Sequence, residues 1–60
     1  MTYRHKKRGT EYMIVEYGIM QDSKFGTLDN IPVVIYRNVE GGTLYVREAK
    51  EFSERFELIE

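Results

Sequence analysis

The chain has 60 residues, of which 42% are hydrophobic, five are tyrosine, three are phenylalanine and none is cysteine. This composition predicts one small folded domain over residues 1–60 and excludes disulfides and thiolate metal sites. A single histidine cannot build an all-histidine metal site, so we expect no metal and no cofactor. The 9 basic and 10 acidic residues give a net charge of -1, which argues against a dedicated nucleic-acid binder.

Nothing in the sequence predicts a membrane protein. The longest apolar runs, at 12–15 and 33–36, are far too short to cross a bilayer. The basic N-terminus is not followed by the apolar stretch of a signal peptide. Together with the lack of cysteine, this predicts a cytoplasmic protein.

In the first half of the chain, residues 3–6 are predicted as a short strand, and 7–10 as a turn in which Gly9 supplies the permissive backbone. Residues 11–21 form the longest strand candidate. Gly18 within it suggests a bulge or bend. Residues 22–30 are predicted as a loop, the longest irregular stretch and a candidate contact region. The long strand has two apolar sets, Met13, Val15, Tyr17 and Ile19 on one face and Tyr12, Ile14 and Met20 on the other.

In the second half, residues 31–37 form a strand that tolerates Pro32 near its start. A turn at 38–42 and a strand at 43–48 complete a predicted antiparallel hairpin. Ala49, Phe52 and Phe56 have helical spacing, so 49–55 is predicted as one or two helical turns. Residues 56–59 follow as a short last strand.

This element order predicts an all-β, mainly antiparallel fold. The expected architecture is a small SH3-like barrel of about five strands with one short helical turn before the last strand. Closing a sheet removes exposed edges and encloses a core in a short chain. An OB-like barrel would normally need a longer chain.

Several short motifs are spread over the chain: Tyr3-Arg4-His5, Gly9, Tyr12, Val34, Tyr36-Arg37, Gly42, Leu44, Tyr45-Val46-Arg47, Phe52 and Glu54. Together they resemble a family of short bacterial and phage proteins known only as a domain of unknown function. The chain departs from the family pattern at Lys6, where an aromatic residue is common, at Tyr45 for Trp and at Glu48 for Pro. The resemblance spans nearly the whole chain and implies a compact cytoplasmic module, in the host cytoplasm if phage-encoded.

Aromatic residues stand beside arginines at several positions of the predicted strands. Guanidinium groups bind phosphate or carboxylate, and aromatic rings stack on bases, so this set is a candidate binding surface. The alternative is cross-strand packing in which Glu11, Glu16 and Glu48 neutralise the arginines. The candidate binding residues are Tyr3, Arg4, His5, Tyr36, Arg37, Tyr45 and Arg47.

No catalytic residue is predicted. His5 is the only histidine, and neither Ser23 nor Ser53 lies in a nucleophile-elbow context. Gly41-Gly42 is better explained as a hairpin turn than as a phosphate-binding loop. The sequence therefore favours a protein that is not an enzyme.

Alternation along the strands places Tyr12, Tyr36 and Tyr45 opposite Val15, Ile35 and Val46. If the aliphatic residues pack inward, tyrosines stay outside and form a contact surface together with residues 22–30. The leading hypothesis is a non-enzymatic module that binds another protein or itself. The alternative is a nucleic-acid or nucleotide-phosphate binder that uses Arg4, Lys6, Lys7, Arg8, Arg37 and Arg47.

Overall fold

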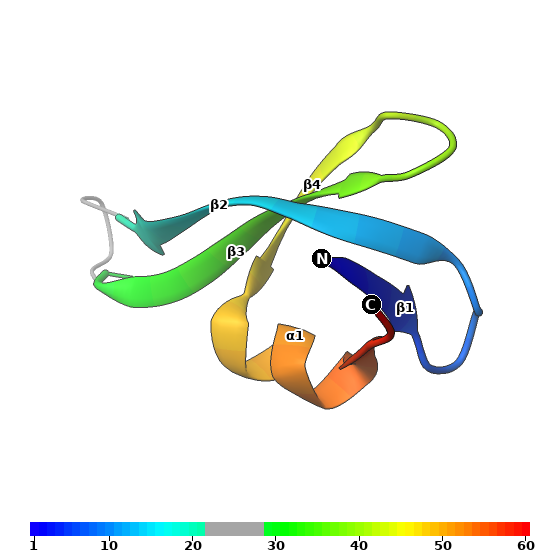
Figure 1. Cartoon of the computed structure of the whole chain (residues 1–60). Coiled ribbons are helices and arrows are strands. Elements are labelled where there is room, and N and C mark those ends of the chain that lie inside the picture. Colours follow the sequence, from blue (N-terminus) through cyan, green and yellow to red (C-terminus); the bar gives the residue numbers. More distant parts are fainter. Residues whose placement is uncertain (22–28) are drawn as a thin grey trace.

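The fold is known from a computed structural model that describes residues 1–21 and 29–60. Its strands form one five-stranded antiparallel sheet in the order β4-β3-β2-β1-β5, and a short helix lies on one side of it (Figure 1). The elements are β1 Thr2–His5, β2 Glu11–Met20, β3 Ile31–Asn38, β4 Leu44–Glu48, α1 Ala49–Arg55 and β5 Phe56–Leu58. The predicted five strands, and the helix before the last of them, are confirmed.

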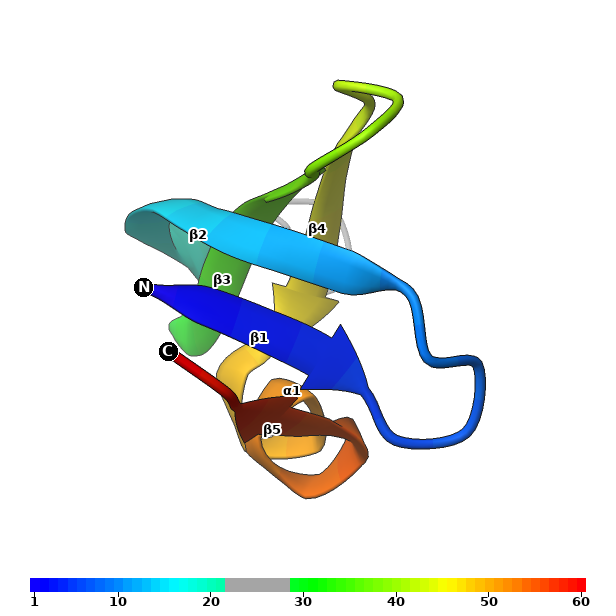
Figure 2. The same cartoon turned by 45° about the vertical axis from the view of Figure 1, so that its right-hand side comes forward.

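The sheet is not closed into a barrel. Among the described residues β4 pairs only with β3, and β5 pairs only with β1, so both are edge strands. Helix α1 connects the two edges and packs against β3, β4 and β5. The helix, together with the shortness of β5, leaves β4 and β5 unpaired with each other (Figure 2). The strand β1 lies between β2 and β5, so the seam at which the expected barrel would close stays open between β4 and β5.

The bend in β2 comes from a bulge, but not at Gly18. The register between β2 and β3 shifts between Ile14 and Glu16, so Val15 is the extra residue. Gly18 pairs with Val33 beyond the bulge, and a Cβ there would make only ordinary contact, 3.5 Å from Val33 Cγ2 and 4.0 Å from Ile35 Cδ1.

The core is aromatic. Helical spacing brings Phe52 and Phe56 onto one face of the sheet, where the two rings stack with centroids 4.2 Å apart. Tyr12 and Tyr36 cover them from β2 and β3, with all four rings at most 7% exposed. Edge-to-face pairs between the tyrosines and the phenylalanines add to the burial of apolar area.

This core reverses the expectation about the tyrosines. Tyr12 and Tyr36 point inward, whereas Val15 and Val46 are 47% and 56% exposed. The reason is the position of Phe52 in α1 and of Phe56 at the start of β5, because these two phenylalanines offer aromatic partners only to the tyrosine face of the sheet. Tyr45 lies on the same face, is 41% exposed, and stacks on Tyr36 at 5.6 Å.

The turns follow the sequence prediction. Gly9 and Gly42 have φ of 79° and 75°, the left-handed region that favours glycine. In the β3–β4 hairpin, the Asn38 side-chain oxygen accepts hydrogen bonds from the backbone N–H groups of Glu40 and Gly41, both at 2.8 Å. Of the predicted 22–30 loop, only residues 29 and 30 lie within the described part of the chain.

Candidate functional site

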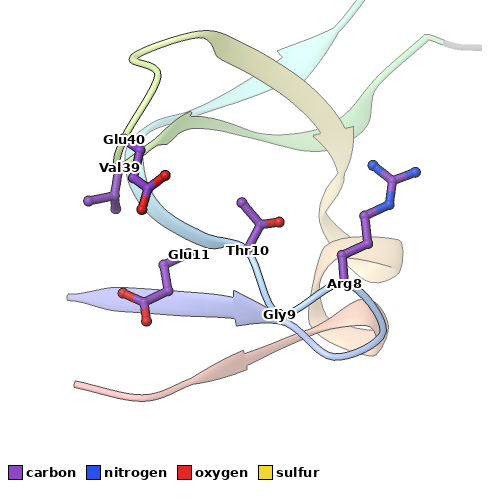
Figure 3. A pocket seen from close by; sticks show the side chains of 6 residues that line it. All are labelled: Arg8, Gly9, Thr10, Glu11, Val39 and Glu40. Atoms are coloured by element: carbon purple, nitrogen blue, oxygen red, sulfur yellow. The ribbon is translucent and has the colours of Figure 1, made fainter.

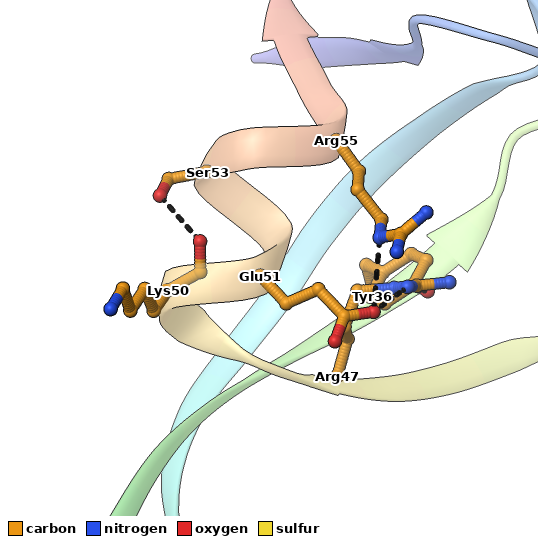
Figure 4. A network of polar contacts seen from close by, with 6 residues as sticks. All are labelled: Tyr36, Arg47, Lys50, Glu51, Ser53 and Arg55. Atoms are coloured by element: carbon orange, nitrogen blue, oxygen red, sulfur yellow. Dashed lines mark hydrogen bonds and ion pairs between the residues drawn. The ribbon is translucent and has the colours of Figure 1, made fainter.

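Arg47 is the centre of a polar network at the margin of the aromatic core (Figure 4). Its Nε donates a hydrogen bond to the Tyr36 hydroxyl at 3.1 Å, and its Nη1 pairs with Glu51 on α1. Arg55 reaches the same Glu51 carboxylate at 3.2 Å. The guanidinium of Arg47 also lies over the Phe56 ring, 5.6 Å from its centroid. These contacts join β4 to the helix and leave little of Arg47 for a ligand.

The network also fixes the charge state of Arg47. The hydrogen bond with Tyr36 is the main cause that raises the pKa of Arg47 above its ordinary value; burial opposes it, and Glu51 adds to it. The guanidinium therefore stays charged under all ordinary conditions.

His5 stabilises the β1–β2 turn through hydrogen bonds to its backbone. Its Nδ1 accepts hydrogen bonds from the backbone N–H groups of Lys7 and Arg8, at 3.2 and 3.1 Å. Its ring is 7% exposed and meets the ring of Phe56 edge-on at 4.9 Å. Burial, and then the nearby positive charge of Arg8, lower the pKa of His5 below its ordinary value. The neutral imidazole is the form that can accept both bonds.

The other predicted site residues are divided between the two faces of the sheet. Tyr3 is half-buried on the core face, edge-on to Phe52 at 5.3 Å. Arg4 projects to the opposite face and pairs with Glu57 at 3.3 Å. Arg37 is exposed on that opposite face. The structure therefore brings Tyr36, Tyr45 and Arg47 together and separates Arg4 and Arg37 from them.

The face opposite the core carries a continuous set of aliphatic side chains, which we call the outer face. The register aligns Met13, Arg37 and Leu44 in one row across β2, β3 and β4, and Glu16, Ile35 and Val46 in the next. A third row joins Gly18, Val33 and Glu48. Three of the apolar side chains are largely exposed, Met13 at 46%, Leu44 at 52% and Val46 at 56%.

The sequence did not predict the outer face as a contact surface. It predicted a contact surface formed by outward-facing tyrosines instead. A signal for the outer face exists: Met13 alternates with Tyr12 and Ile14, and Val46 with Tyr45 and Arg47. Choosing the inward set required knowing that Phe52 and Phe56 cover only one face, and the sequence does not say which.

Among the hollows elsewhere on the surface, two bear on the search for a ligand site. One, of about 320 Å³, is lined by Arg8, Gly9, Thr10, Glu11, Val39 and Glu40. Figure 3 shows the Arg8 side chain turned away from Glu11 and Glu40, so its charged groups do not converge on one point. The other, of about 300 Å³, is an apolar groove between α1 and the sheet, and its lining includes Tyr3, Ile14, Tyr17, Val34, Ala49 and Phe52.

Within the described part of the chain, no three His, Cys, Asp or Glu residues gather in a way that could hold a metal ion. None of its helices is long and apolar enough to cross a membrane. Comparisons with family models, curated proteins and solved structures found no match. The resemblance to the family of unknown function therefore stays a prediction.

Proposed function

We propose that this protein is a small non-enzymatic module that binds protein, either another chain or itself, through the outer face. The observation that carries the proposal is the exposed set of Met13 on β2 and Leu44 and Val46 on β4, which share one face of the sheet with β3 between them. Contiguous apolar surface rimmed by charge is typical of protein-binding sites. Here Glu16 and Glu48 lie beside the apolar set, and Arg37 lies within it, between Met13 and Leu44.

The relation between the two faces supports this proposal. The aromatic residues pack against one another and against Ile14 and Val34 on the core face, whereas Met13, Leu44 and Val46 lie outside that cluster and stay largely exposed. Burying such a set against a second protein removes apolar area from water at about 25 cal/mol per Å². A bound partner would thus supply stability that a 60-residue core provides only in small measure.

The alternative, binding of nucleic acid or nucleotide phosphate, has less support. Arg4 is paired with Glu57, and Arg47 with Glu51, so two of its six basic residues are already neutralised. Arg37 lies on the outer face, whereas Arg47 lies on the core face. Nucleic-acid binders normally gather positive charge on one surface. The exposed turn residues Lys6, Lys7 and Arg8 are the observation that keeps this alternative testable.

The test compares capture of partners by the wild type and by two lysine variants. Met13→Lys places a charge in the outer face, two strands away from the β4 edge. Leu58→Lys is the matched control, because Leu58 is 52% exposed but pairs with Tyr3 on the other face. The immobilised proteins are exposed to a bacterial lysate with and without nuclease, and captured chains are identified by mass spectrometry.

We expect a specific protein to be captured by the wild type and by L58K, and capture to fall at least tenfold with M13K. The same capture should persist after nuclease treatment and at 0.3 M salt, because apolar contacts are insensitive to salt screening. Capture that disappears with nuclease or with salt would support the alternative instead. Equal capture by M13K would overturn the proposed surface.

A further inference from the structure

The β4 edge has unpaired backbone groups directly beside the outer face. The Asn38 N–H donates to the Thr43 carbonyl at 3.0 Å, so this pair of residues is hydrogen-bonded across the hairpin. Hydrogen-bonded and non-hydrogen-bonded pairs alternate along an antiparallel ladder. Leu44, Val46 and Glu48 therefore direct their N–H and C=O groups away from β3. The same three side chains lie on the outer face.

We propose that a second copy of this chain binds along β4, antiparallel, with Val46 opposite its own counterpart. This inference rests on the proposed function, since it names one occupant of the outer face and its edge. The two sheets then join into one continuous sheet across a two-fold axis. Each copy's Leu44 lies opposite Glu48 of the other copy. The N–H and C=O groups of Val46, the C=O of Leu44 and the N–H of Glu48 pair across the axis, whereas the Glu48 carbonyl, at the N-cap of α1, accepts within the helix.

The charges of β4 select this register. A shift that centres the pairing on Arg47 would place two guanidinium groups directly opposite each other, which is unfavourable. A shift toward Tyr45 would place Glu48 beyond the end of the partner strand, opposite the Gly42 turn, and would lose part of the pairing. Centring on Val46 pairs all five residues of β4 and places each Arg47 opposite Tyr45 of the other copy.

Charge complementarity across the axis points to a second copy rather than an unrelated strand. Arg37 stands next to Leu44 in its row, and Glu48 of the second copy would follow in the same row. Strands lie about 4.8 Å apart, so the Cα atoms of Arg37 and that Glu48 would be about 10 Å apart, within reach of two long side chains. Both residues are exposed, and neither forms an ion pair with another described residue.

Within one chain the two charges cannot meet. Arg37 pairs with Leu44 and Glu48 with Val33, so four residues of strand, about 13 Å, separate them. The two-fold axis brings each Arg37 to Glu48 of the other copy, twice per dimer. Between these charged positions the row of Ile35 and Val46 continues into the same row of the second copy, which extends the apolar outer face across the junction.

The first test is the mass in solution over a concentration series, measured by sedimentation equilibrium. The wild type should approach twice its 7.2 kDa chain mass as concentration rises. Val46→Pro removes one outward N–H and no hydrogen bond of the folded chain, so the variant should stay folded and monomeric. Val46→Lys should have the same effect. The matched control is Val15→Lys, at a 47% exposed valine of the β2 bulge, which should still dimerise.

The second test reverses the charges. Arg37→Glu alone and Glu48→Arg alone should each weaken dimerisation about tenfold, because symmetry counts every reversed pair twice. The double variant R37E/E48R restores opposite charges across the axis and should regain most of the lost affinity. Neither residue belongs to the core cluster, so these variants should stay folded and test the dimer independently of V46P.

The outcomes separate this inference from the proposed function. A wild type that stays monomeric at every concentration overturns the self-pairing, but capture of another protein that M13K abolishes would leave the proposed function standing. If V46K and both single charge-reversal variants dimerise as strongly as the wild type, the dimer uses another surface, and this result also overturns the inference. A monomer that captures nothing overturns both. Two results together support both: V46K loses the dimer, and R37E/E48R regains the dimer affinity that each single charge reversal loses.

Discussion

The hydrogen bond from Arg47 Nε to the Tyr36 hydroxyl, 3.1 Å long, joins the core to the polar margin of the sheet. Tyr36 is 3% exposed, so its hydroxyl needs a partner inside the protein. Arg47 supplies that partner and at the same time ties β4 to Glu51 on the helix. One residue of the predicted binding set is thereby explained as a structural link.

Substitution at this link should reduce stability in a non-additive way. Arg47→Met keeps the apolar stem but leaves the Tyr36 hydroxyl without a donor, so we expect a loss of about 1–3 kcal/mol. Tyr36→Phe removes the hydroxyl and should cost about 1 kcal/mol. The double variant should cost less than the sum of the single ones, because no buried group is then left unpaired.

Urea denaturation of all four proteins measures these differences. Lys50→Met is the control, since Lys50 is exposed on α1 and forms no ion pair with another described residue. Strict additivity of the two changes would show that the hydrogen bond contributes nothing.

The stacked phenylalanines should dominate the stability of the core. Phe52 is 4% exposed and contacts Phe56, Tyr36 and Tyr3. Phe52→Ala should cost about 3–5 kcal/mol through lost burial and a cavity. Because small domains are marginally stable, the variant should be largely unfolded at 25 °C. Far-UV circular dichroism and thermal melting check this, with the exposed Glu54→Ala as control; a cooperative melt of F52A near that of the wild type would contradict it.

The two glycines of the β3–β4 turn offer a matched pair. Gly42 has φ of 75°, and nothing lies within 4 Å of an added Cβ, so Gly42→Ala changes only backbone strain. We expect a loss of about 1 kcal/mol. Gly41 does not have a positive φ, and an added Cβ would make only ordinary contact with Asn38. Gly41→Ala should therefore be neutral or slightly stabilising in the same urea measurement, and equal losses at both positions would refute the strain argument.

Local patterns predicted the elements well. Glycines at positive φ mark the turns at Gly9 and Gly42, and the spacing of Ala49, Phe52 and Phe56 marks the helix. These are properties of neighbouring residues, so they can be read along the chain.

The sequence predicted less of the candidate site. Whether tyrosines or valines face inward depends on where α1 packs, and the bulge at Val15 depends on the pairing of β2 with β3. The open seam between β4 and β5 depends on the helix that lies between them. Such long-range contacts decide the identity of the outer face, and no pattern within one strand contains them.

His5 should make stability depend on pH near neutrality. The folded state holds the imidazole neutral, because burial and the charges of Arg8, Arg47, Arg55 and Lys7 lower its pKa below the ordinary 6.5. The unfolded chain therefore binds a proton more readily than the folded chain between the lowered pKa and about 6.5. The contribution of His5 is fully present above about pH 6.5 and is lost as the pH falls through that window.

Urea denaturation between pH 7.5 and 5.5 should show the free energy of unfolding decreasing with falling pH. His5→Asn is the matched variant, because an amide oxygen can still accept from the Lys7 and Arg8 N–H groups and does not titrate. The variant should show no pH slope over the same range. A wild type with a flat profile, or an H5N variant that keeps the slope, would show that another group is responsible.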